Sequence, residues 1–149
     1  MSNAKPLNGV KILELSSVVT ASLATMILCD QGAEVIKVEP TGIGDSMRHL
    51  GTQKGGFSAI FSNCNRGKKS LNLNLKDQDE VKFLLSLVKE SDVFISNYRP
   101  GVNDRLGLGL KALRKINSKI IYVSISGFGE TGPLASAPAY DHIIQGMLG

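Results

Sequence analysis

The most chemically useful side chains of this 149-residue sequence are cations that stand next to glycine turns. Four of them surround the alternating segment 70–75: Arg66, Lys68, Lys69 and Lys76. Cations that converge at a turn bind phosphate oxygens, lysine as a point charge and arginine as a planar fork. A charge run can equally be a solvated face, so these residues alone leave phosphate binding and solvation open as alternatives.

Another cation follows the segment NYRPG. Pro100 and Gly101 predict a tight turn directly after a strand, which places Arg105 near a sheet edge as a candidate phosphate clamp. The alternative is that Asp104 or a main-chain carbonyl satisfies this guanidinium. The residues alone support both interpretations.

Nucleophilic and metal chemistry have little support in the sequence. The segment around Ser126 lacks the G-x-S-x-G pattern of a nucleophile elbow, and neither His49 nor His142 has an evident nucleophile as partner. Cys29 and Cys64 have no second cysteine pair, which excludes a zinc module and a disulfide scaffold. We therefore predict reduced thiols and no metal site.

The turn SSVVTAS, residues 16–22, follows the first predicted strand and contains no glycine. A dinucleotide site needs G-x-G-x-x-G there, so that the backbone can approach a pyrophosphate. The sequence thus argues against a NAD-dependent oxidoreductase, and we predict no permanently bound cofactor. Glu39 ends the second predicted strand, where such folds keep a ribose-binding acid, but we expect it to cap the loop that follows.

Strands and helices alternate along the chain. Segments 10–15 and 34–39 alternate apolar and polar residues, as strands do, and the helix between them ends at Gly32. Strand, helix and strand in this order form a βαβ unit, which belongs to a parallel sheet. The glycine-rich segment 40–56 predicts a long loop.

The second half of the chain repeats this alternation. Segment 70–75 predicts a strand, and Asp77 predicts the N-cap of a helix whose apolar positions fall on one face. Further strands are expected at 92–96 and 119–125, with a short helix at 110–116. Residues 1–149 therefore predict one α/β domain with a Rossmann-like, doubly wound, mostly parallel sheet, whose ligands bind outside the carboxyl ends of the strands.

The composition narrows the class of ligand. Hydrophobic residues make up 42% of the chain and charged residues 20%, which excludes disorder. The aromatic content is 5% with no tryptophan, so few side chains could stack on nucleic acid. The first nine residues are polar, and no apolar run reaches the roughly 18 residues of a membrane helix. We expect a cytoplasmic protein without membrane or nucleic-acid partners, and its net charge of +4 suits a phosphorylated small molecule.

Several motifs occur in a characteristic order: LNGVKILEL, LCDQGAEVIKVEP, GD followed by Arg48, NRGKKSLNLNLK, NYRPGV with DRLGL, and SISGFGETGP with AYDHIIQGMLG. Together they resemble the class III coenzyme A transferases, the family of formyl-CoA and carnitine CoA transferases that includes α-methylacyl-CoA racemases. The resemblance covers nearly the whole chain. It implies that coenzyme A and its thioesters are substrates.

The resemblance also implies which residues contact coenzyme A. Those positions are Ser17, Val18, Val19, Thr20, Leu73, Lys76, Asn97, Tyr98, Arg105, Leu106, Gly127 and Phe128. Arg105 and the cations near Lys76 would hold phosphates, Asn97 and Tyr98 would place the adenosine or pantetheine part, and the turn at 126–129 would line the thioester pocket. Val19 stands where some transferases carry a glutamine, which argues against a formyl-CoA-specific activity.

In this family an aspartate forms aspartyl-CoA, and the resemblance places that aspartate beyond Gly149. We therefore expect no catalytic nucleophile in this chain. It would be the CoA-binding N-terminal part of a longer, interlocked homodimer, an enzyme that moves coenzyme A from an acyl-CoA donor to a carboxylic acid.

Two alternatives remain beside the transferase. The racemase branch carries G-H-D where this chain has Tyr140 before Asp141, and His142 lies on the other side, which favours the transferase. The second alternative is a non-catalytic module that only binds coenzyme A.

Overall fold

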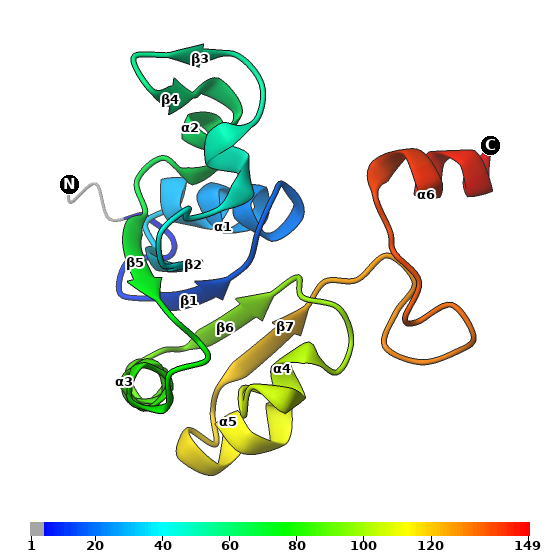
Figure 1. The fold of residues 1–149 in the computed structure, drawn as a ribbon. Helices are drawn as coiled ribbons and strands as arrows, with labels where there is room; N and C mark the ends of the chain where they lie inside the picture. Colours follow the sequence, from blue (N-terminus) through cyan, green and yellow to red (C-terminus); the bar gives the residue numbers. More distant parts are fainter. Residues whose placement is uncertain (1–4) are drawn as a thin grey trace.

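A computed structural model describes residues 5–149 and shows a five-stranded parallel sheet. Its strands are β1 (Lys11–Leu15), β2 (Glu34–Pro40), β5 (Lys69–Leu73), β6 (Val93–Ser96) and β7 (Ile121–Ser124). Their order is β5-β2-β1-β6-β7, so the first strand in the sequence is the central one (Figure 1). Every neighbouring pair is parallel, which confirms the predicted doubly wound α/β sheet.

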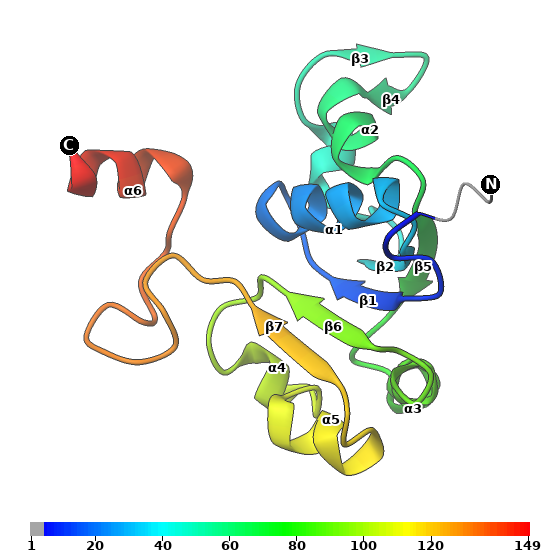
Figure 2. The same ribbon diagram turned by 180° about the vertical axis from the view of Figure 1, so that it is seen from behind.

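Helices cover both faces of this sheet. They are α1 (Thr20–Asp30), α2 (Ala59–Asn65), α3 (Gln78–Val88), α4 (Val102–Arg105) and α5 (Leu110–Ile116), while a further helix, α6 (Asp141–Leu148), lies away from the sheet (Figure 1). Figures 1 and 2 show α1 and α2 on one side of the sheet and α3, α4 and α5 on the other. The helix predicted at 110–116 has the bounds observed for α5.

The alternation of β1 divides the core into two layers. Leu13 and Leu15 pack with Leu84 of α3 and Leu113 of α5, all at most 1% exposed. Ile12 points to the opposite face and packs in a smaller cluster with Ala21 of α1. Burial of a leucine side chain contributes roughly 1.5–3 kcal/mol, so the larger layer supplies most of the hydrophobic stabilisation.

The start of α3 confirms the predicted N-cap. Asp77 Oδ1 accepts hydrogen bonds from the amides of Asp79 at 2.8 Å and Glu80 at 3.3 Å. The Glu80 carboxylate accepts from the amide of Asn74 at 2.6 Å. Together these bonds tie the end of β5 to the first turn of the helix.

The segment 40–56, predicted as a long loop, contains short elements instead. These are the 3-10 helix η1 (Ser46–His49) and β3 (Gln53–Lys54), which forms a hairpin with β4 (Phe57–Ser58) directly after the segment. Asp45 caps η1 by accepting from the amide of Met47 at 2.9 Å, and the Ser58 hydroxyl donates to the carbonyl of Leu50 at 2.7 Å. Elements of two to four residues are too short to show a periodicity, so contacts distant in sequence define them.

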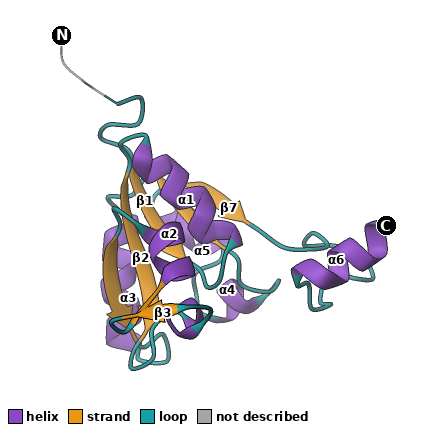
Figure 3. Cartoon of the chain, turned by 90° about the horizontal axis from the view of Figure 1, so that it is seen from above, coloured by secondary structure: helices purple, strands orange, loops and turns teal. Residues whose placement is uncertain are grey.

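Residues after β7 extend away from the sheet, as Figure 3 shows, and end in α6, which has no buried residue. Gly127 is needed at the start of this segment because a Cβ there would lie 2.0 Å from the Cβ of Ala139. Within residues 5–149, every helix is too short or too polar to cross a membrane.

Candidate functional site

The carboxyl ends of the parallel strands form the edge where ligands bind in open α/β sheets. The structure distributes the predicted contact residues over three places near this edge. The first is the turn at 17–20 after β1, with Asn97 and Tyr98 after β6. The second is a cavity lined by Lys76, Arg105 and Leu106. The third is the pair at 127–128 in the extended segment, while Leu73 lies in the core under the first two.

The turn after β1 has an unusual backbone. Val18 has a φ of 61°, and among residues 5–149 it is the only residue other than glycine with a positive φ. A β-branched side chain in this region costs on the order of 1–3 kcal/mol, so surrounding contacts must hold it there. One of them is the amide of Val18, which donates to Asp45 Oδ1 at 3.1 Å.

Asn97 holds the same turn from the side of β6. Its Oδ1 accepts from the amide of Ser17 at 3.1 Å, and its Nδ2 donates to the carbonyl of Ser17 at 2.7 Å and to the Thr20 hydroxyl at 3.0 Å. The Asn97 amide thus bridges the ends of β1 and β6. A contact between Asn97 and coenzyme A stays a prediction, and in this structure the amide orders the turn.

Tyr98 lies half-buried against the larger core layer. Burial raises the pKa of its hydroxyl, and the negative charge of Asp45 raises it further. The phenol therefore stays protonated around neutral pH and can donate a hydrogen bond.

A cavity of about 370 Å³ opens between the start of α3 and the end of α4. Lys76 and Arg105 both line it, and neither side chain makes a hydrogen bond or ion pair within residues 5–149. Lys82 adds a third positive charge, with its ammonium 2.7 Å from the exposed carboxylate of Asp79. The structure thus brings together two of the predicted phosphate-binding cations with their donors available.

A buried charged cluster, which the sequence analysis did not find, lies beneath the turn. It consists of two acids and two lysines whose side chains are at most 2% exposed: Glu14, Lys37, Asp45 and Lys68. The Lys37 ammonium is 2.8 Å from Glu14 Oε1 and 2.9 Å from Asp45 Oδ2. The Lys68 ammonium is 2.8 Å from Glu14 Oε2 and donates to the carbonyl of Ser22 at 2.7 Å.

The ionisation of the cluster follows from these contacts. Burial of the Glu14 carboxylate opposes its negative charge, but the attraction and hydrogen bonds of Lys37 and Lys68 outweigh burial and lower the pKa of Glu14 to about 2. Burial lowers the pKa of Lys68, and the charge of Glu14 opposes that effect. At neutral pH the acids and lysines of the cluster therefore compensate each other.

This cluster corrects the interpretation of the cations around β5. Lys68 is directed inward to Glu14, Arg66 pairs with Asp30, and the Lys69 ammonium lies 3.3 Å from Glu34. These cations have protein partners and do not converge on a common ligand position. Of the four, Lys76 alone has a side chain without a polar partner in the described part of the chain.

Glu39 caps the loop that follows, as predicted. Its Oε2 accepts from the amide of Asp45 at 2.9 Å and from Arg48 Nε at 2.7 Å, and its Oε1 accepts from the Ser70 hydroxyl at 2.8 Å. Burial opposes ionisation of Glu39, but the hydrogen bonds, that of Arg48 first, lower its pKa to about 2. The loop is thereby fixed at the position from which Asp45 reaches the turn.

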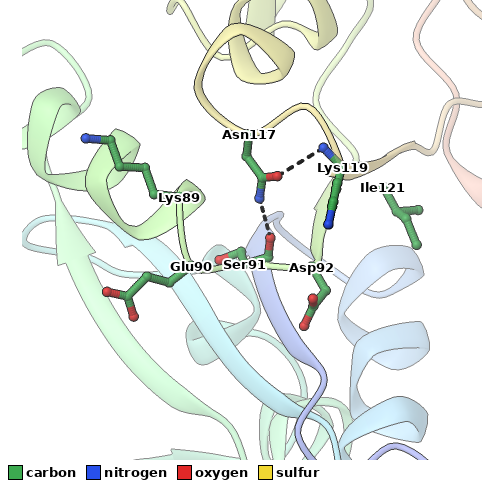
Figure 4. Close-up of a pocket in the computed structure, with 7 residues that line it drawn as sticks. All are labelled: Lys89, Glu90, Ser91, Asp92, Asn117, Lys119 and Ile121. Atoms are coloured by element: carbon green, nitrogen blue, oxygen red, sulfur yellow. Dashed lines mark hydrogen bonds between the residues drawn. The ribbon is translucent and has the colours of Figure 1, made fainter.

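A second hollow, of about 300 Å³, lies at the opposite edge of the sheet, beside the amino ends of β6 and β7 (Figure 4). Its lining side chains bind the chain itself: Asn117 Nδ2 donates to the carbonyl of Ser91 at 2.8 Å. None of the predicted contact residues lines it. Within residues 5–149, no group of three His, Cys, Asp or Glu side chains is placed to hold a metal ion.

Comparisons with known proteins identify the family of this chain. The model of CoA-transferase family III matches residues 7–149. The acetyl-CoA:oxalate CoA-transferase of Acetobacter aceti is 49% identical over 144 residues, which cover 97% of this chain and 37% of that protein. The human succinyl-CoA:glutarate CoA-transferase is 45% identical over 150 residues, which cover all of this chain and 34% of that protein.

Solved structures show the same fold. A CAIB/BAIF family protein from Brucella suis superposes with a TM-score of 0.91 at 40% identity, over 97% of this chain and 39% of that one. The orthorhombic form of Rv3272 from Mycobacterium tuberculosis gives a TM-score of 0.92 at 36% identity, over 98% of this chain and 41% of that one. The chain thus spans little more than a third of the length of the curated relatives that it matches.

Proposed function

This chain belongs to CoA-transferase family III, and on that basis we propose that it is the coenzyme A-binding part of an enzyme that moves coenzyme A from an acyl-CoA to a carboxylic acid. The two curated relatives described above are CoA-transferases whose names specify oxalate or glutarate. A small dicarboxylate is therefore the proposed acceptor. In this proposal the covalent steps, through aspartyl-CoA, belong to an aspartate beyond residue 149, in a homodimer.

The observation that carries the proposal is the pair of cations in the 370 Å³ cavity, Lys76 and Arg105, whose side chains have no polar partner among residues 5–149. Coenzyme A bears phosphate groups on its adenosine part and a long neutral pantetheine arm. Guanidinium and ammonium groups with free donors bind phosphate by charge-assisted hydrogen bonds, roughly twice as strong as neutral ones. The lining also contains Asp77, Gln78, Lys82 and Gly107, and the apolar side chains of Leu75, Val81 and Leu106 suit the neutral parts of the ligand.

We assign roles to the remaining predicted contact residues from their places relative to the carboxyl ends of the strands. The turn at 17–20 and Tyr98 would contact the pantetheine arm, since they lie at the carboxyl ends of β1 and β6, where ligands bind in such sheets. Gly127 and Phe128 would line the thioester pocket. No residue of this chain is assigned a covalent role.

Binding measurements on Arg105→Ala in the complete protein test the proposal. We expect the affinity for coenzyme A to fall by about 1.5–3 kcal/mol, the range for hydrogen bonds to charged groups, with the stability unchanged. Titration calorimetry with coenzyme A measures this loss.

The matched control is Arg114→Ala. Arg114 is an exposed arginine of α5 that does not line the cavity, so its removal is expected to leave the affinity as it is. Equal affinities of Arg105→Ala and the unmodified protein would exclude Arg105 as a phosphate ligand. Absence of coenzyme A binding by the unmodified protein would exclude the proposed function itself.

A further inference from the structure

The buried charged cluster is joined to the backbone of the turn at 17–20 through one side chain. Asp45 directs Oδ2 to the Lys37 ammonium at 2.9 Å. Its Oδ1 accepts from the amide of Val18 at 3.1 Å and from that of Met47 at 2.9 Å. Asp45 itself is 1% exposed, so no water competes for these bonds.

Lys37 in turn is fixed by groups on either side of the turn. Its ammonium donates to Glu14 Oε1 at 2.8 Å on β1, to the Ser16 carbonyl at 3.3 Å and to the Ser22 hydroxyl at 3.0 Å on α1. The lysine therefore holds the Asp45 carboxylate at a defined distance from β1 and α1. Replacing a whole buried charged cluster by hydrophobic residues often leaves a protein as stable as before, so stability alone does not explain such a cluster. Its best-attested use is to fix one arrangement of the groups around it.

The residue that Asp45 holds is the strained one. Val18 has a φ of 61°, a conformation that a β-branched residue leaves unless its surroundings oppose the change. A flip to negative φ would turn the amide of Val18 away from Asp45 and redirect the backbone between Ser17 and Thr20. The peptide group between Ser17 and Val18 is thus held at both ends, with Asn97 Nδ2 donating to the Ser17 carbonyl and the Val18 amide donating to Asp45 Oδ1.

We propose that Asp45 is a positioning residue for the transfer reaction: its Oδ1 holds Val18 in the left-handed conformation and so presents the turn to the pantetheine arm of coenzyme A. This rests on the proposed function, because the turn matters for the reaction only where coenzyme A lies against it. Asp45 is not among the predicted contact residues and acts through Val18.

Two substitutions of Asp45 in the complete protein distinguish two roles of this residue: its oxygen as the acceptor that positions Val18, and its negative charge as the partner of the buried lysines. Asp45→Asn keeps an oxygen acceptor at Oδ1 and removes the charge, whereas Asp45→Glu keeps the charge and displaces the acceptor. Asp45→Asn places an amide nitrogen against the Lys37 ammonium in place of Oδ2, so it is expected to lose some affinity, and positioning predicts that it loses less affinity for coenzyme A than Asp45→Glu does. Positioning also predicts that Asp45→Glu binds coenzyme A about tenfold more weakly than the unmodified protein, the effect expected from the loss of one hydrogen bond to a charged group. The reverse order of affinities would overturn the proposal.

A second pair of variants tests the link to Val18. Asp45→Ala is expected to weaken coenzyme A binding, and Val18→Gly added to it is expected to restore part of the affinity, because glycine adopts a positive φ without strain. A double variant as weak as Asp45→Ala, or weaker, would contradict the proposal. If Asp45→Ala does not fold, Asp45→Glu takes its place in the same comparison.

The crystal structure of Asp45→Glu separates this proposal from the proposed function. We expect Val18 to leave its positive φ in that variant, whether or not the protein binds coenzyme A. A Val18 that keeps its φ near 61° overturns the positioning role. An unmodified protein that does not bind coenzyme A overturns the proposed function instead.

Discussion

Two lysine-containing regions at the same edge of the sheet use their charge in opposite ways. In the buried charged cluster, Lys37 and Lys68 are surrounded by acids and hydroxyl groups at hydrogen-bonding distance. In the cavity between α3 and α4, Lys76 and Arg105 have no polar partner within the described residues. The lysines of the buried charged cluster donate hydrogen bonds to groups of the protein, whereas the donors of Lys76 and Arg105 are available to a ligand.

The difference follows from burial. A charge removed from water needs nearby partners, because its desolvation is otherwise uncompensated. A charge at the rim of a cavity stays hydrated until a ligand replaces the water. The number and type of cations therefore do not decide their role, whereas their exposure and partners do.

The largest effect expected from this comparison is that of Lys37→Met. Removing the ammonium leaves Glu14 and Asp45 buried with one positive charge fewer, which is expected to lower the free energy of unfolding by about 3–5 kcal/mol. Lys76→Met, in the exposed cavity, is the matched control and is expected to change it by about 0.5 kcal/mol or less. Urea titrations of both variants measure the difference, and equal stabilities would remove the distinction between the two regions.

The second largest effect is expected at acidic pH, where protonation of Glu14 removes its contribution to the stability. The pKa of Glu14 in the folded protein is about 2, below its ordinary 4.5, so its contribution is fully present above about pH 5 and is lost as the pH falls toward 2. From the size of the shift the contribution is roughly 3 kcal/mol. The stability difference between the unmodified protein and Glu14→Gln should therefore shrink between pH 5 and pH 2. A difference that is constant over this range would show that Glu14 is not held by the two lysines.

The smallest expected effect is that of substitutions at Asp77, an acidic residue of the cavity lining. Asp77 caps α3 and also lines the cavity beside Lys76. Asp77→Ala should cost about 1 kcal/mol of stability through the lost cap. Asp77→Ser keeps the cap and removes a negative charge, so it should stay stable and bind coenzyme A slightly more tightly. Weaker binding by Asp77→Ser would indicate that the carboxylate, not the cations, contacts the ligand.

The sequence was a good guide to the elements with a clear period. The alternation at 10–15 and 34–39 predicted β1 and β2 closely, and Asp77 marked the start of α3. The hairpin of β3 and β4 was missed, because two-residue strands carry no pattern. The cavity could be expected in part, since Lys76 and Arg105 both follow predicted strands.

The buried charged cluster was missed because the polar residues of the alternating segments were used only to predict strands, and no pairing between them was considered. Glu14 and Lys37 are two of these residues, and α1 and α2 cover their face of the sheet. Their register was the available signal: Glu14 and Lys37 are direct neighbours in the β1–β2 pair. Opposite charges at matching positions of two adjacent parallel strands indicate a pair in the interior once both faces are known to be covered.

The strand order also has a consequence for synthesis on the ribosome. The central strand β1 is made first, and its neighbour β2 follows after one helix, but its other neighbour, β6, comes roughly fifty residues after β2. At about 5–20 residues per second, one edge of β1 stays open for roughly 3–10 s. During that interval the nascent chain exposes one unpaired backbone edge of its central strand, and this is when a chaperone would protect it best.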